Sequence, residues 1–182
     1  MASYPHTIEN GNGESLTFLG VRDTADGPTL DLRNEVQPDC GPPMHVHFHQ
    51  EEALTVQQGQ LGYQIQGEPE KFAGPGETVV FAPGTPHRFW AAGGEVLRCT
   101  GYARPPHNLE YFLSQVYAST KREGGDKPND FDAAFLMGHF ESEFDMLDLP
   151  APVKRVVFPV LRALGALTGR FRKYAGAPRP VG

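Results

Sequence analysis

GPPMHVHFHQEEALTVQQG, the stretch at residues 41–59, is the most informative part of this 182-residue chain. His45 and His47 stand two positions apart, and residues with that spacing on a β-strand point to the same face of the sheet. After a short connection, the next predicted strand has Glu52 and Leu54 on one face. The stretch therefore predicts two imidazoles and a carboxylate that meet in the interior of a β-structure.

A second stretch, GETVVFAPGTPH at residues 76–87, adds His87 at the start of another strand. Each of these residues has an ordinary structural alternative, because a lone buried histidine is more often a hydrogen-bonded core residue than a ligand. Together, three histidines and Glu52 in an apolar interior have few ways to be satisfied without a cation. Three imidazoles and a carboxylate suit one divalent transition metal (Fe, Ni, Zn, Mn or Cu) better than Mg²⁺ or Ca²⁺.

Around these two stretches, the chain from Leu16 to Ala103 consists of short alternating or apolar runs separated by turns rich in Gly and Pro. This pattern is typical of antiparallel β-sandwiches and barrels. The expected strands are 16–22, 29–37, 45–47, 52–57, 61–66, 78–81, 87–90 and 96–102. With no helix-length segment between them, a closed jelly roll is favoured over a parallel sheet.

The two stretches together resemble the paired motifs of the cupin superfamily, and their separation resembles that of single-domain cupins of type 2. The positions of the first motif are filled by Gly41, His45, His47, Glu52 and Gly59, and those of the second by Gly76, Gly84 and His87. Ala82 and Ala91 depart from the second motif, but neither position is a metal ligand. The resemblance implies a mainly β fold, a cupin jelly-roll β-barrel, with a metal on His45, His47, Glu52 and His87 and frequent homodimers.

Beyond Pro105 and Pro106 the apolar period changes from that of strands to that of helices. Helices are expected at 109–119 and 131–144, and a third from about Val153, with a kink or a late start at Pro159. The predicted division is a barrel at residues 1–105 and a helical C-terminal extension at 106–182, packed on the barrel or on a partner subunit. A looser resemblance links this helical, basic C-terminus to a bacterial group of cupin proteins.

The chain has a formal net charge of −6, but the segment from Pro150 onward carries seven Lys or Arg and no acid. A basic amphipathic helix can lie on an anionic membrane surface, although packing on the barrel or on a partner subunit is the favoured expectation. The barrel segment has no basic cluster, so no nucleic-acid partner is predicted. The opening residues suggest no secretory signal, so a cytoplasmic protein is expected. Cys40 and Cys99 lack CxxC spacing and are expected to be reduced thiols.

The remaining candidates at the site are open at this stage. Parity with Leu54 favours Glu52 over Glu51 as the carboxylate ligand, while His49 and Tyr63 are tentative proton donors in catalysis. The expected lining of the barrel is apolar and aromatic, which suits a small organic ligand. The lining candidates are Met44, Leu54, Val56, Tyr63, Phe81 and Phe89.

Three functions fit this site. The first is a metal-dependent, dioxygenase-like activity on an aromatic or enolic compound. The second is a non-catalytic protein that binds a metal or a small molecule, because a ligand set alone does not establish turnover. The third is an isomerase that uses the metal as a Lewis acid.

Overall fold

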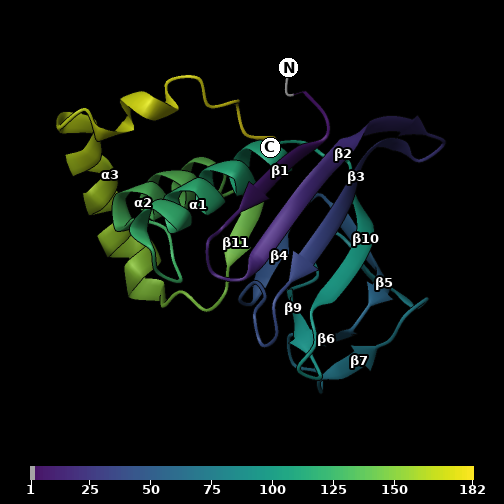
Figure 1. Cartoon of the computed structure of the whole chain (residues 1–182). Coiled ribbons are helices and arrows are strands. Elements are labelled where there is room, and N and C mark those ends of the chain that lie inside the picture. The colour runs from purple at the N-terminus through teal and green to yellow at the C-terminus, as the bar shows by residue number, and fades with distance from the viewer. Residues whose placement is uncertain (1–2) are drawn as a thin grey trace.

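Two antiparallel sheets face each other in the computed structural model, which describes residues 3–182, and the helices gather on one side of them (Figure 1). The first sheet has the order β1 (His6–Glu9), β2 (Glu14–Thr24), β3 (Gly27–Val36), β10 (Leu97–Arg104), β5 (Glu51–Gln58) and β8 (Thr78–Phe81). The second has the order β11 (Phe144–Met146), β4 (His45–His47), β9 (His87–Ala92), β6 (Gln60–Ile65) and β7 (Lys71–Ala73). The fold is the predicted jelly-roll β-barrel with C-terminal helices.

Each of the eight predicted strands is present, with ends that agree within two residues. The alternation that predicted them is visible in β3, where Leu30, Leu32, Asn34 and Val36 are buried on one face. Three further strands, β1, β7 and β11, were not predicted. Strands β7 and β11 have only three residues each, too few for a period of two to be recognised.

The helices follow the expected order, with two corrections. Helix α1 spans Leu109–Glu123 and runs past the predicted end at 119, whereas α2 spans Asp130–His139 and ends well before the predicted position 144. Phe144 instead opens β11, which pairs with β4. The predicted break at Pro159 is confirmed: a π-helical turn, η1 (Val153–Val157), leads into α3 (Phe158–Leu167), which has the proline in its first turn, where its missing N–H is tolerated. A 3₁₀ turn, η2 (Arg170–Tyr174), follows.

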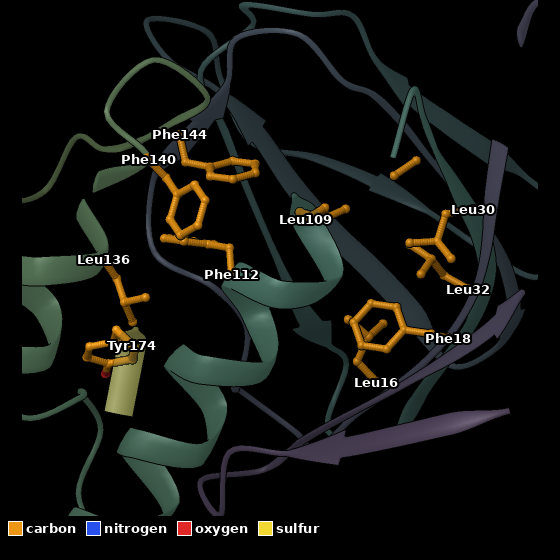
Figure 2. Close-up of a cluster of buried hydrophobic side chains, with 11 residues drawn as sticks. Leu16, Phe18, Leu30, Leu32, Leu109, Phe112, Leu136, Phe140, Phe144 and Tyr174 are labelled. Carbon is orange, nitrogen blue, oxygen red and sulfur yellow. The ribbon is translucent and has the colours of Figure 1, made fainter. Parts of the chain in front are cut away.

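The buried apolar side chains form two clusters. The helix-side cluster joins the strands to α1 and α2 (Figure 2), and it contains Leu16, Phe18, Leu30, Leu32, Ala103, Leu109, Phe112, Leu136, Phe140, Phe144 and Tyr174. The barrel-side cluster fills the rest of the barrel and contains Val36, Leu54, Val56, Leu61, Ala73, Val79, Phe81, Phe89, Ala91, Leu97 and Cys99. Cys40 and Cys99 are both free thiols, half-buried and buried respectively.

Helix α3 lies outside α2, on the side away from the strands (Figure 1). Its buried residues are Phe158 and Gly165, which face inward from an otherwise exposed helix. The two helices approach closely at Gly138, where a Cβ atom would collide with the guanidinium of Arg162. None of the helices in residues 3–182 is long and apolar enough to cross a membrane.

Candidate metal centre

The structure brings the four predicted ligands together. His45, His47 and Glu52 offer ligand atoms that all lie within 4.8 Å of one another. His87 joins them, with its Nε2 atom 3.2 Å from Oε2 of Glu52 and its ring centroid 4.4 Å from that of His45. Three imidazoles and one carboxylate thus converge on one point inside the barrel.

Three strands from two sheets bring these residues to one place. In the second sheet, β4 and β9 pair antiparallel with His45 directly opposite His87. Glu52 comes from β5 of the first sheet, where it lies between Phe81 and Ala103. Gly41 lets the chain enter β4 against β9, because its φ is +154° and a Cβ atom there would collide with the carbonyl oxygen of Phe89.

Backbone carbonyls fix the orientation of two imidazoles. Nδ1 of His45 lies 2.9 Å from the carbonyl oxygen of Pro43, and Nδ1 of His87 lies 2.8 Å from that of Thr85. A carbonyl oxygen only accepts hydrogen bonds, so each Nδ1 carries a proton and donates it. In a neutral imidazole this leaves Nε2 with a free lone pair, the form in which histidine binds metals.

The contact between His87 and Glu52 tests whether a cation fits here. Nε2 of His87 lies 3.2 Å from Oε2 of Glu52. Such an approach is favourable only when a proton or a metal cation lies between the two atoms. Nδ1 of His47 is also buried without a hydrogen-bond partner. The donor set therefore fits a bound cation.

The pKa values of His45, His47 and Glu52 also fit a bound cation. Burial, together with the neighbouring His47 and His87, lowers the pKa of His45 to about 3. Burial also lowers the pKa of His47 to about 4, although the charge of Glu52 opposes this. For Glu52, burial raises the pKa, but the hydrogen bond from His87 and the nearby imidazoles outweigh it, giving about 2. At neutral pH the imidazoles of His45 and His47 are therefore neutral and Glu52 is a carboxylate, the ligand forms that metals require.

The group lies between the two apolar clusters. The ring of His47 meets Phe144 of the helix-side cluster edge-on, with 5.5 Å between centroids. The ring of His87 stacks on Phe81 of the barrel-side cluster at 3.8 Å. Of the other predicted lining residues, Met44, Leu54, Val56 and Phe89 are buried and Tyr63 is partly buried. The ligand atoms are therefore set in apolar and aromatic walls.

The structure separates the remaining candidates from the group. Glu51 accepts hydrogen bonds from Tyr102 and Arg104, at 2.8 and 2.6 Å, on the other side of the strand from Glu52. The ring of His49 lies 6.0 Å from that of His107, in the loop region. Tyr63 meets Phe81 edge-on at 6.1 Å, so its ring lies behind the aromatic side chain that stacks on His87.

Three residues near the group were not identified from the sequence. Gln50 is 1% exposed, and neither of its amide atoms has a hydrogen-bond partner. Phe144 reaches His47 from β11, a strand too short to recognise. The hydroxyl of Tyr117 donates to Glu14, and burial together with the charges of Glu14 and Glu52 raises its pKa. Helical spacing indicated only that Tyr117 lies on a packed face.

Comparison with known proteins adds a family. The family model of the cupin domain matches residues 33–100, a range that includes all four candidate ligands. No curated protein matches the chain.

Solved structures provide further matches. A conserved protein of Klebsiella pneumoniae with a double-stranded β-helix domain is 17% identical, with a TM-score of 0.44, over 58% of this chain and 82% of that one. KdgF from Halomonas sp. is 15% identical, with a TM-score of 0.46, over 54% and 86%. A cupin-like protein from Thermotoga maritima is 21% identical, with a TM-score of 0.41, over 56% and 74%.

Proposed function

The chain belongs to the cupin superfamily through its domain at residues 33–100, and we propose that the barrel binds one divalent transition metal through His45, His47, Glu52 and His87. The observation that carries this proposal is the convergence of the four side chains: ligand atoms of His45, His47 and Glu52 lie within 4.8 Å of one another, and His87 Nε2 lies 3.2 Å from Glu52 Oε2. The set of nitrogen and oxygen donors favours Fe, Ni, Cu, Zn or Mn.

The second part of the proposal is that a small organic molecule binds beside the metal. Phe81, Phe144 and the surrounding aliphatic side chains offer apolar contact, and burial keeps bulk water away. Gln50 precedes β5, two residues before Glu52, and its buried amide has one unused acceptor and one unused donor group. We propose that this amide orients a polar group of the ligand, because a buried polar side chain without a partner is costly unless it binds something.

The reaction we propose is an oxygenase-type conversion of an aromatic or enolic compound. When bound, the metal supplies Lewis acidity and, if it is a redox metal, electron transfer. The protein residues hold the ligand atoms in a fixed orientation, exclude water and present the Gln50 amide to the substrate. The second candidate is a role in binding without turnover. It is supported by the contacts of His49 and Tyr63, the expected proton donors, whose rings lie against His107 and Phe81.

Metal content measured by inductively coupled plasma mass spectrometry tests the site. We expect near-stoichiometric metal in the tag-free protein and its loss in a variant with both His45→Ala and His87→Ala. The matched control carries His49→Ala and His107→Ala, which remove two histidines outside the group and should retain the metal. Absence of metal in the wild type after reconstitution, or equal metal in the first double variant, would overturn the proposal.

Oxygen consumption separates the functional candidates once the metal is known. Stoichiometric O₂ uptake with an aromatic or enolic compound supports the oxygenase. Thermal stabilisation by that compound without a product supports the binding protein. Conversion of the compound without O₂ uptake supports the Lewis-acid isomerase.

We also propose that residues 106–182 act as an extension that covers one side of the barrel of residues 1–105. Leu109, Phe112 and Phe140 pack against the strands in the helix-side cluster (Figure 2). Strand β11 lengthens the second sheet beside β4. Because Phe144 from this extension contacts His47, we expect the extension to restrict what reaches the metal.

A further inference from the structure

The outer face of the C-terminal helix is apolar and exposed. Five aliphatic side chains form this apolar stripe, and Leu167, with 85% of its surface exposed, is the most open of them. The stripe consists of Val156, Val157, Val160, Leu164 and Leu167. It lies opposite Phe158 and Gly165, the buried residues of α3, so packing within the chain does not explain it. Exposed apolar patches of this kind mark interaction surfaces.

A mainly apolar hollow lies on another side of α3. It has a volume of about 460 Å³ and is lined by Phe135, Pro159, Arg162, Ala166 and Phe171. The hollow lies between α2, α3 and η2, and Pro159, Arg162 and Ala166 place one of its walls on the same helix as the stripe. One guanidinium, that of Arg162, therefore lies in the wall of this hollow.

The segment that carries the stripe has basic side chains only, and its arginines have no carboxylate partner within residues 3–182, although the guanidinium of Arg170 lies over the ring of Phe131 on α2. Both lysines of this segment are already paired, Lys154 with Asp145 and Lys173 with Asp132. In the part of the chain that the structure describes, none of the five arginines after Pro150 forms an ion pair. These are Arg155, Arg162, Arg170, Arg172 and Arg179. Arg155 precedes the stripe, and Arg170 and Arg172 follow it.

We propose that the η1–α3 face binds the surface of an anionic phospholipid membrane. The aliphatic side chains would enter the boundary between headgroups and acyl chains, and the arginines at both ends would contact lipid phosphates. This inference is independent of the metal centre. It also reverses the expectation that packing on the barrel or on a partner subunit would cover this helix.

Two other occupants fit these observations less well. A second copy docked through the same stripe about a two-fold axis would bring arginines toward arginines, with no acid in the segment after Pro150 to neutralise them. Nucleic acid would satisfy the arginines but would leave the aliphatic side chains in water. A lipid surface satisfies both the charges and the apolar area.

Cosedimentation of the full-length protein with vesicles tests this proposal. We expect binding to vesicles of phosphatidylcholine mixed with phosphatidylglycerol, weaker binding at high salt, and little binding to pure phosphatidylcholine. Replacing Leu164 and Leu167 by Asp should weaken binding by about tenfold or more. The matched control is Val80→Asp, which changes an exposed aliphatic side chain on β8.

Arginine variants test the electrostatic half separately. Arg155→Gln and Arg172→Gln should each weaken binding to the anionic vesicles by about fivefold, whereas Arg33→Gln on β3 should not. Equal binding to both vesicle types, no binding to either, or wild-type binding by the stripe variant would overturn the proposal. Light scattering measures the oligomeric state in solution and tests whether a second copy occupies the stripe. A wild-type dimer that is lost in the stripe variant, with vesicle binding unchanged, would assign the face to a second copy.

Discussion

The ring of Phe81 lies flat on the imidazole of His87, with 3.8 Å between centroids and 7° between planes. Phe81 ends β8 and His87 begins β9, so the turn between them folds one aromatic side chain onto the other. Within that turn, Thr85 accepts the Nδ1 proton of the same imidazole, and the N–H of Gly84 donates to the carbonyl of His47. The stack and the two hydrogen bonds together fix the ring.

Phe81→Leu should therefore weaken metal binding without removing a ligand. Loss of the stack frees the imidazole of His87, and outer-shell changes of this kind reduce metal affinity by about tenfold or more. The smaller side chain should also lower the free energy of unfolding by about 1 kcal/mol. Competition with a chromophoric chelator measures the affinity. Phe72→Leu, at an exposed position on β7, is the control, and equal affinity in both variants would contradict the role of the stack.

Gln50→Met tests whether the buried amide exists for a ligand. Both amide atoms lack partners, so an apolar side chain of similar length should raise the free energy of unfolding by about 1–2 kcal/mol. Metal content should stay as in the wild type. Urea denaturation of the metal-free protein measures the difference. A destabilised variant would mean that Gln50 supports the fold, and the proposed ligand contact would be abandoned.

The sequence predicted the ligand group more reliably than its surroundings. A period of two favoured Glu52 over Glu51, because side chains of successive residues point to opposite faces of a strand, and Glu52 is the carboxylate that lies beside His45 and His47. The contact of Phe144 with His47 had no local signal: β11 follows a helix, has three residues, and pairs with a strand far away in the sequence. The exposure of the stripe on α3 could not be predicted either, because the same apolar spacing is expected of a helix face that is packed against another element.

Asp132 should make the attachment of the C-terminal turn sensitive to acid. Its buried carboxylate accepts hydrogen bonds from Ser119 and Arg122, at 2.7 and 2.6 Å, and from Lys173 at 2.7 Å. Burial raises the pKa of this carboxyl group, but the hydrogen bonds from Lys173 and Ser119 and the charge of Lys173 outweigh it, so the pKa is lowered. Its stabilisation is complete above the unfolded pKa of about 3.9 and is lost as the pH falls through the lowered folded value.

Asp132→Asn should consequently reduce the free energy of unfolding by about 1–3 kcal/mol at pH 7. The difference from wild type should shrink once the pH falls below about 4, because the wild-type protein must then protonate the carboxylate. Urea denaturation across this pH range measures it. The control is Asp130→Asn, which changes an exposed carboxylate two residues before Asp132 on α2. A difference that stays constant with pH would show that the charge of Asp132 is not the cause.

Glu143 should fasten the C-terminal tail to the body of the protein. Its carboxylate is fully buried and is engaged on both oxygens: Oε2 accepts from the backbone N–H of Asn108 at 3.2 Å, and Oε1 accepts from the Asn108 side chain at 2.6 Å and from the N–H of Val181 at 3.0 Å. The hydroxyl of Ser142 donates to the carbonyl of Val181 beside it. The tail is thus held where α1 begins.

Glu143→Gln should release this tail, because the amide group must turn its NH₂ toward an N–H donor at one of the two oxygen positions. We expect the free energy of unfolding to fall by about 1–3 kcal/mol, and carboxypeptidase should remove the last residues faster than from the wild type. Glu141→Gln changes a neighbouring exposed carboxylate and should leave both measurements unchanged. Digestion of the Glu143 variant at the wild-type rate would mean that other contacts of the tail, such as that of Pro178 with His139, suffice to hold it.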